Sequence, residues 1–217
     1  MTEYQYSIVA RRFRQSAVAV GILSVSLGLA AQSVNLEDGL EAYWTFDEGE
    51  GDAAGDVSGN SRGAMMYDNP AFADESIVWL SEDFGQFGGA IDFNGNYFLA
   101  VADYLGVGGT EPRTISLWVN TVWDPTGTSA LVAWGPNVAQ QRWHFKLEGS
   151  NGSLRTENQG GNNFGSMAVN DGFWHHVVSV FPAGGTVIGD VRHYVDGVLD
   201  PVQSGGVGNP VDTNIDP

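Results

Sequence analysis

Hydrophobic and polar residues alternate with a period of two in many short segments of the chain. Between residues 40 and 47, Leu40, Ala42, Trp44 and Phe46 alternate with more polar residues. The same pattern recurs in residues 90–93, 97–101, 114–120, 129–134, 142–148, 153–157, 173–181 and 191–197. Successive side chains of a β-strand point to opposite faces, so each segment is predicted to be a strand with one buried face.

The segments between these predicted strands are rich in Asn, Asp and Gly, which favour turns. No window after the N-terminal segment shows an apolar period of 3.6 residues, so no long helix is expected. The pattern therefore predicts an all-β fold, a two-sheet antiparallel β-sandwich or jelly roll with a shared core. The polar residues 202–217 are interpreted either as a flexible tail or as the end of an incomplete fold.

The first 31 residues differ from the rest and are predicted to be a secretory signal peptide. Three arginines between residues 11 and 14 precede an uncharged run that ends at Ala31 and is shorter than the roughly 20 residues that span a bilayer. Cleavage after Ala31 is expected, and the alternative is an uncleaved membrane anchor. The chain then divides into a signal peptide (1–31), a linker (32–38) and one β domain (39–217), secreted or on the cell surface and without membrane contact after cleavage.

Composition excludes two classes of protein. The chain has 26 Asp and Glu against 9 Lys and Arg, a net charge of −17. Removal of residues 1–31 takes away three Arg and one Glu, which leaves 25 acidic and 6 basic residues and a net charge of −19. Nucleic acid is not an expected partner, because binding to phosphates requires clustered Lys and Arg. The absence of Cys excludes disulfides and thiolate zinc sites.

Five motifs in order resemble a LamG-like jelly-roll domain of bacterial secreted proteins, within the concanavalin A-like lectin and glucanase superfamily. They are GLEAYWTFDEGEGDAAGDVSGN (39–60), FGGAIDFNGN (87–96), ADYLGVGGTEPRTISLWVNT (102–121), NDGFWHHVV (170–178) and RHYVDGVL (192–199). The resemblance implies two antiparallel sheets packed face to face, often with a calcium ion at one rim, and binding of carbohydrate or protein without catalysis. Nothing in the sequence matches the family's closing strand, a motif like IDDVRIY, so the sandwich is expected to lack that strand.

An acidic loop near the start of the domain is the predicted calcium site. Eight acidic residues and no Lys or Arg lie between Val34 and Ser61. Calcium binds carboxylate and carbonyl oxygens, which a Gly-rich loop can turn inward, so Asp47 and Asp56 are the predicted ligands of a structural calcium ion. The alternative is a solvated acidic surface loop, because the spacing matches no EF-hand.

Two tryptophans are the predicted ligand-binding residues. Trp79 and Trp123 lie in segments that resemble loops, where an exposed indole could stack on a sugar ring or could instead cover the edge of the core. Catalysis is not expected, because the nearest carboxylate group, Glu48, Glu50 and Asp52, lies among turn glycines rather than on a rigid strand. His175 and His176 are adjacent in a predicted strand, so they cannot share one metal ion.

Together these features predict a secreted, non-catalytic module that binds a polysaccharide or a glycosylated surface. The negative charge favours neutral glycans unless calcium bridges an anionic one. One alternative is a structural or adhesive sandwich whose partner is an extracellular protein. A third reading is a glycan-active enzyme.

Overall fold

The computed structural model describes residues 37–68, 76–93, 95, 97–102, 104–122, 129–149, 151–201 and 206–214. Almost all regular structure in these residues is β. The strands are β1 (Ala53–Ala54), β2 (Ala64–Asp68), β3 (Val78–Leu80), β4 (Ala90–Asp92), β5 (Tyr97–Ala100), β6 (Arg113–Asn120), β7 (Ser129–Trp134), β8 (Trp143–Leu147), β9 (Ser153–Glu157), β10 (Asn162–Ala168), β11 (Trp174–Phe181), β12 (Arg192–Val195) and β13 (Val198–Asp200). The one helical element among the described residues is a 3₁₀ turn, η1 (Ile188–Asp190).

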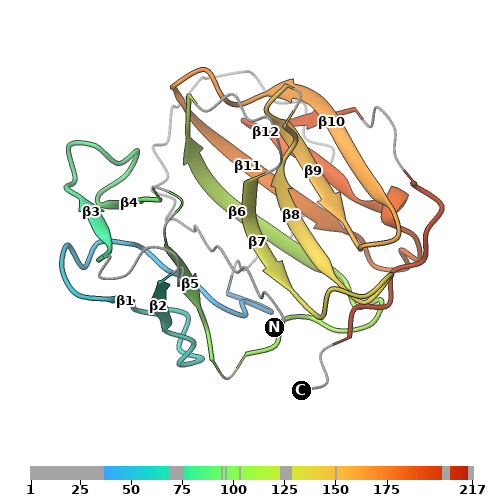
Figure 1. The fold of residues 1–217 in the computed structure, drawn as a ribbon, viewed down its shortest axis with the longest axis horizontal. Helices are drawn as coiled ribbons and strands as arrows, with labels where there is room; N and C mark the ends of the chain where they lie inside the picture. The colour runs from blue at the N-terminus through green and yellow to red at the C-terminus, as the bar shows by residue number, and fades with distance from the viewer. Residues whose placement is uncertain are drawn as a thin grey trace, which may run out of the picture.

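Two four-stranded antiparallel sheets form the main body of the molecule (Figure 1). One sheet has the strand order β10-β9-β8-β7 and the other β13-β12-β11-β6. Side chains from both sheets meet in one core cluster of buried residues: Leu117, Leu131, Phe145, Leu147, Leu154, Val169, Val177 and Val195. The predicted two-sheet antiparallel sandwich is therefore confirmed.

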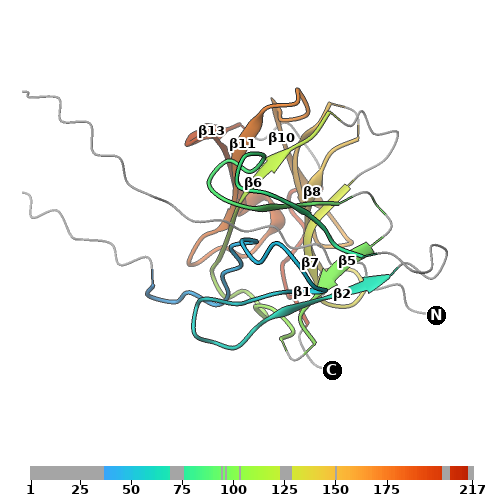
Figure 2. The ribbon, with the colours of Figure 1, turned by 90° about the vertical axis from the view of Figure 1, so that its left-hand side faces the viewer.

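The N-terminal strands form a smaller unit beside the sandwich. Strands β1, β2 and β5 make a three-stranded sheet, and β3 and β4 make a hairpin (Figure 1); Figure 2 views the molecule from this side. The unit has its own buried cluster, which includes Trp44, Phe46 and Leu99. It contacts the sandwich through Phe87, whose ring centroid lies 5.1 Å from that of Trp118 in an edge-to-face arrangement.

The predicted strands agree with the structure except at the start of the domain. Residues 40–47 form no strand, and within them only Trp44 makes an isolated bridge, to Asp56. The chain cannot continue as a strand there because Phe46 has φ +58°. The alternation of residues 40–47 still predicts which side chains are buried, because Trp44 and Phe46 are both in the core. Strands β1, β2, β3, β10 and β13 were not predicted, because they are short or are rich in polar residues, Gly or Ala.

The segment from residue 206 to 214 packs on the sandwich. Val211 is 1% exposed and joins a second core cluster with Trp143, Phe181 and Ile188. Thr213 forms an antiparallel bridge with Gly109. The flexible-tail interpretation is therefore wrong for residues 206–214, while the other residues of that stretch lie outside the described part of the chain.

Arg113, at the start of β6, joins this segment to the sandwich. Its guanidinium group donates to four backbone carbonyl oxygens of residues 107–111 and to Oγ1 of Thr213, at 2.7 to 3.2 Å. All five N–H groups of the side chain thus have an acceptor. The guanidinium carbon also lies 4.8 Å from the ring centroid of Trp143. Burial lowers the pKa of Arg113 to about 10, so the group remains charged at neutral pH.

A buried set of polar side chains crosses between the two sheets. Thr156 of β9 bonds through Oγ1 to Oγ of Ser179 on β11, at 3.0 Å, and to Nε2 of His193 on β12, at 2.8 Å. His193 is 1% exposed and its ring stacks on Phe145, with centroids 5.9 Å apart. Burial lowers the pKa of His193 to about 4, so the imidazole is neutral in the folded protein near pH 7.

Substitution of Arg113 by Lys should destabilise the fold. Lysine keeps the charge but has three donors on one nitrogen, so several of the buried carbonyls would lose their partners. We expect the free energy of unfolding to fall by about 3 kcal/mol, measured by urea denaturation. Arg192→Lys is the matched control, because Arg192 is exposed, and should change little. Equal stability of the two variants would contradict the role given to Arg113.

His193 should make the protein less stable in acid. In the unfolded chain the imidazole binds a proton below its ordinary pKa of 6.5, whereas the folded protein resists protonation until about pH 4. Between these values the free energy of unfolding should fall by about 3 kcal/mol from this group alone. The measurement is urea denaturation from pH 7 to pH 4 for the wild type and for His193→Gln. Parallel stability curves for the two proteins would show that His193 has no such role.

Candidate functional site

The outer face of the β7–β10 sheet carries a row of polar side chains. In β8, Trp143, Phe145 and Leu147 point into the core, so His144 and Lys146 between them point outward. Residues paired across antiparallel strands share a face. The pairing therefore defines the polar face, which consists of Ala130 and Ala133 of β7, His144 and Lys146 of β8, Arg155 and Glu157 of β9, and Asn162 and Phe164 of β10.

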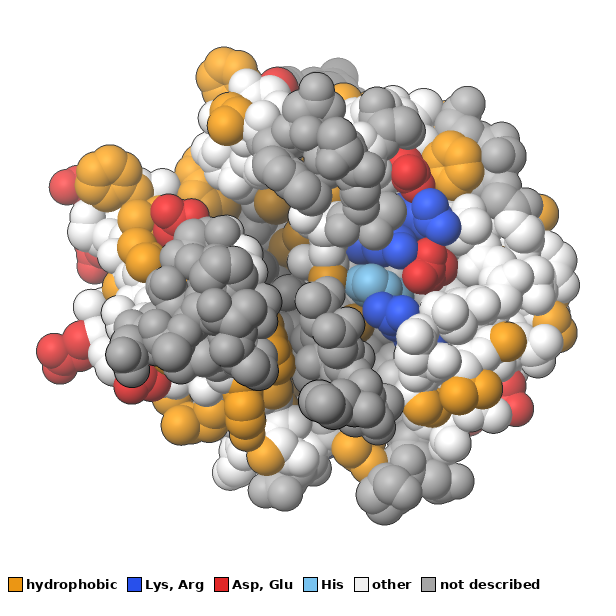
Figure 3. All heavy atoms as spheres, viewed as in Figure 1, with side chains coloured by type: hydrophobic (Ala, Val, Ile, Leu, Met, Phe, Trp, Pro, Cys, Tyr) orange, Lys and Arg blue, Asp and Glu red, His pale blue; other side chains and the backbone are white. Residues whose placement is uncertain are grey.

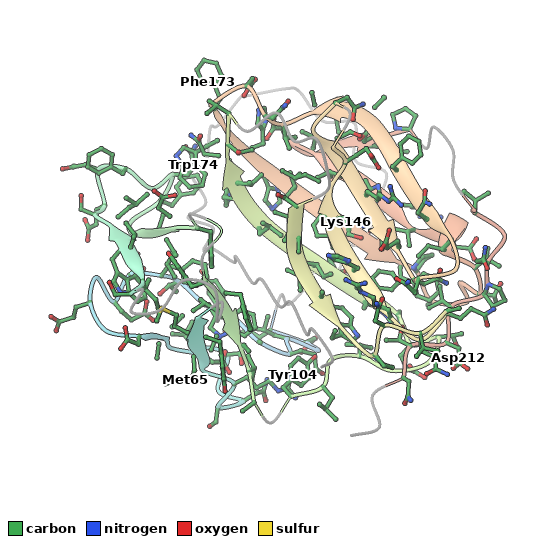
Figure 4. All side chains as sticks on the ribbon, viewed as in Figure 1. Met65, Tyr104, Lys146, Phe173, Trp174 and Asp212 are labelled. Carbon is green, nitrogen blue, oxygen red and sulfur yellow. The ribbon has the colours of Figure 1, made fainter. Side chains whose placement is uncertain are left out.

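The polar face is visible at the molecular surface. Figure 3 shows Lys, Arg, Asp, Glu and His side chains gathered over this sheet, and Lys146 is labelled on it in Figure 4. His144 and Lys146 are nevertheless only 7% and 5% exposed. Next to them on β7, Ala130 and Ala133 have small side chains. Charged and titratable groups are therefore held in a largely desolvated position on a rigid sheet.

Ion pairs connect the charged residues of the polar face. Glu157 accepts from Nζ of Lys146 at 2.7 Å and from Nη2 of Arg155 at 2.9 Å. Arg155 also donates from Nη1 to Glu148, at 2.7 Å, at the end of β8. Burial by itself would raise the pKa of Glu157, but its contacts with His144, Lys146 and Arg155 outweigh this and lower the pKa to about 2. Glu157 is therefore ionised at all ordinary pH values.

Three buried polar atoms of this face have no hydrogen-bond partner among the described residues. They are Nε2 of His144, Nε of Arg155 and Oδ1 of Asn162. Each lies on a different one of three adjacent strands. A buried donor or acceptor without a partner costs about 1 to 3 kcal/mol, and native proteins contain few. Nε1 of Trp143 and Oδ1 of Asn163, two buried residues of the same sheet, are also without a partner in the described part of the chain, but the three atoms of the polar face make this surface the candidate for a polar ligand.

The sequence reasoning did not identify this site. It assigned residues 142–148 and 153–157 to strands, and both strands are confirmed as β8 and β9. The available signal was the alternation of His144 and Lys146 with the apolar Trp143, Phe145 and Leu147. That alternation placed two polar side chains outward, but only the pairing of β8 with β9 brings them beside Arg155 and Glu157.

The predicted ligand-binding tryptophans do not lie on the polar face. Trp79 lies in strand β3, so the prediction of a loop at this residue is wrong. It is half-buried against the N-terminal core cluster, and its indole nitrogen donates to the carbonyl of Gly51 at 2.8 Å. Sugar binding by Trp79 stays a prediction. Trp123 lies outside the described residues.

The two predicted calcium ligands both accept hydrogen bonds from the backbone. Asp56 accepts from the backbone nitrogens of Tyr43, Ser58 and Arg62 and from Oγ of Ser58, at 2.8 to 2.9 Å. Burial would raise the pKa of Asp56, but these hydrogen bonds lower it. Asp47 accepts from the backbone nitrogen of Gly89 at 2.8 Å.

This arrangement fits a calcium ligand poorly at Asp56. A carboxylate offers about four lone-pair positions, and four hydrogen bonds occupy those of Asp56. Among the described residues, no group of three or more Asp, Glu, His or Cys side chains is placed to hold a metal ion. Calcium in this loop stays a prediction, and it would require backbone carbonyls or a rearrangement of Asp56.

The paired histidines are directed to opposite faces of β11, as predicted. His175 lies between two carboxylates, with Nε2 3.0 Å from Asp171 and Nδ1 2.8 Å from Asp196. His176 lies on the outer face, with Nε2 2.8 Å from Oγ of Ser116. Burial alone would lower the pKa of His175, but the hydrogen bonds and charges of the two aspartates outweigh it and raise the pKa. The two rings therefore have separate partners.

Calcium is tested by thermal denaturation in EDTA and in millimolar calcium chloride. A structural ion that binds only the folded chain must raise the midpoint of unfolding, by mass action. Magnesium chloride at the same concentration is the control for ionic strength. An equal midpoint in EDTA and calcium would contradict the predicted ion and would leave hydrogen bonding as the whole role of Asp56.

Comparison with known proteins identifies the family. The Laminin_G_3 family, described as the concanavalin A-like lectin/glucanases superfamily, matches residues 93–216, more than half of the chain. The match includes both four-stranded sheets. No curated protein and no solved structure shows significant similarity to the chain. Within the described residues there is no helix with the length and hydropathy needed to cross a membrane. The chain belongs to the concanavalin A-like lectin/glucanase superfamily, as a Laminin_G_3 domain.

Proposed function

We propose that the protein is a non-catalytic module that binds carbohydrate on the polar face of the β7–β10 sheet. The three unpartnered buried atoms of His144, Arg155 and Asn162 carry this proposal. Sugar hydroxyl groups both donate and accept hydrogen bonds, so one sugar can satisfy donors and an acceptor together. The chain belongs to a superfamily whose description names lectins and glucanases, and this supports a carbohydrate ligand.

An aromatic side chain adds an apolar surface to this polar set. Phe164 of β10 is half-buried and is paired with Arg155 across the strands, so it lies on the same face. Carbohydrate sites combine an aromatic ring, which stacks on the C–H face of a sugar, with a few fixed polar groups. All of these residues lie on strands, whose positions are more rigid than those of loops.

The carboxylates of the polar face do not favour glycoside hydrolysis. A hydrolase needs one carboxyl group that holds a proton at neutral pH and a second that attacks or activates water. Glu157 has a pKa of about 2, and Glu148 is paired with Arg155. Glu157 is therefore not suited to donate a proton to a leaving sugar. This supports a binding function rather than catalysis.

The proposal includes a place outside the cell, secreted or on the cell surface, where glycans are exposed. The N-terminal segment supports this through its sequence alone, since it lies outside the described residues. The rival proposal is an adhesive sandwich that binds an extracellular protein. A glycan array separates the two, because the rival predicts binding to no glycan.

The aromatic residue provides the test of the proposed face. For a glycan selected on the array, Phe164→Ala should weaken binding about fivefold, since ring stacking contributes about 1 kcal/mol. Isothermal titration calorimetry measures the change. The matched control is Phe173→Ala, because Phe173 is 70% exposed and lies outside the polar face. Equal affinity of the two variants would place the site elsewhere, and an array without any bound glycan would contradict the function.

A further inference from the structure

The hydrogen bonding of His144 fixes which ring nitrogen carries its proton. Nη2 of Arg142 lies 2.6 Å from Nδ1 of His144. The same Nδ1 also lies 3.7 Å from Oε1 of Glu157, which is beyond hydrogen-bonding distance. A guanidinium group can only donate, so Nδ1 is the acceptor of the close contact with Arg142 and the proton of the neutral ring lies on Nε2. Burial is the largest influence on the pKa of His144 and lowers it, which favours the neutral ring. Nε2–H is then a buried donor without an acceptor among the described residues.

Arg142 is the cation on this side of the sheet that makes no direct salt bridge among the described residues, and Glu157 acts on it only through its charge at longer range. It donates from Nη1 to Oδ1 of Asn137 at 2.9 Å and to Oε1 of Gln159 at 3.4 Å, and from Nη2 to His144. All three acceptors are neutral. Two of its five N–H groups therefore have no partner among the described residues.

The cations around the polar face exceed its carboxylates by one. Arg142, Lys146 and Arg155 carry three positive charges, and Glu148 and Glu157 carry two negative ones. The chain as a whole has a net charge of −17. A net positive charge on this patch of an otherwise strongly acidic protein makes the patch a local site of attraction for an anion. A ligand with one negative charge would neutralise it.

We propose that the polar face binds the carboxylate of a sugar acid, such as a uronic acid residue of a glycan, against Arg142, while Nε2–H of His144, on the far side of the imidazole, donates to a hydroxyl group of the same sugar. A carboxylate has only acceptors, which suits a place where the unpartnered groups are donors. The sugar's hydroxyl groups supply a donor for Oδ1 of Asn162. This inference rests on the proposed function and replaces the neutral glycan expected from the net charge.

The ligands for the test are short oligosaccharides of galacturonic, glucuronic, mannuronic and guluronic acid, each paired with its methyl ester. Esterification removes the charge and keeps the sugar ring, its hydroxyl groups and their stereochemistry. We expect at least one free acid to bind the full chain about tenfold or more tightly than its ester, by isothermal titration calorimetry. The preference should weaken as salt increases, because it depends on charge. Poly-L-glutamate, an anion without a sugar, should not bind.

Arg142→Gln tests the residue that gives the preference. Glutamine can still form hydrogen bonds but carries no charge. Because Arg142 is half-exposed, the variant should fold, and circular dichroism checks that it does. It should remove most of the difference between acid and ester, while the control Arg192→Gln, an exposed cation on the other sheet, should keep it. His144→Phe removes the Nε2 donor and should weaken the binding of acid and ester alike.

The outcomes separate this inference from the function on which it rests. Equal affinity for acid and ester, or binding of neutral or sulfated glycans without any uronate, would overturn the sugar-acid inference and leave carbohydrate binding intact. Failure to bind any glycan would overturn both. A preference for the acid that survives Arg142→Gln would overturn the assignment of the carboxylate to Arg142.

Discussion

The hydrogen bonding of Arg113 is the constraint on which the sandwich depends. One buried guanidinium group joins the start of β6, the loop at residues 107–111 and the C-terminal segment at Thr213. It also lies against the ring of Trp143, the first residue of β8. Backbone carbonyls in a buried loop need donors, and a planar group with five N–H bonds satisfies several of them at once. A single side chain therefore connects both sheets at this edge.

The same edge sets the geometry of the polar face. Trp143 of β8 stacks on Trp134 of β7, with ring centroids 5.9 Å apart. On its other side, β8 pairs with β9 without a break over four residues. Because side chains alternate along a strand, fixing Trp143 in the core directs His144 outward. The register then places His144 beside Glu157, and Lys146 beside Arg155. The packing of the core thus determines which charges meet on the surface.

Much of the fold could be predicted from the sequence, because alternation reports burial directly. Eight of the nine predicted segments contain observed strands, namely β4 to β9, β11 and β12. The prediction of a strand at residues 40–47 was wrong, because a hydrophobic pattern does not reveal the positive φ of Phe46. Strand β10 was missed because its residues, with two Asn, one Ser and one Gly, resemble a loop.

The candidate site was much harder to predict than the fold. Trp79 was predicted to bind a ligand because its segment resembles a loop, but its side chain packs on the N-terminal core cluster. Asp56 appeared free to bind an ion but accepts four hydrogen bonds from its own loop. Lys146 and Glu157 come from β8 and β9 and Arg142 from the residue before β8, so the meeting of their charges depends on register and on the desolvation of the sheet face. Neither property follows from composition, and the net charge even favoured a neutral ligand.

The central claim is that ligand binds the outer face of the β7–β10 sheet. Its most direct test is NMR chemical-shift mapping of the ¹⁵N-labelled protein during titration with a bound oligosaccharide, including the imidazole resonances of His144. The account predicts shifts concentrated in β8, β9 and β10, with a change at Nε2–H of His144 and little change in β11 and β12. Shifts confined to the β6–β11 sheet or to the N-terminal unit would contradict it.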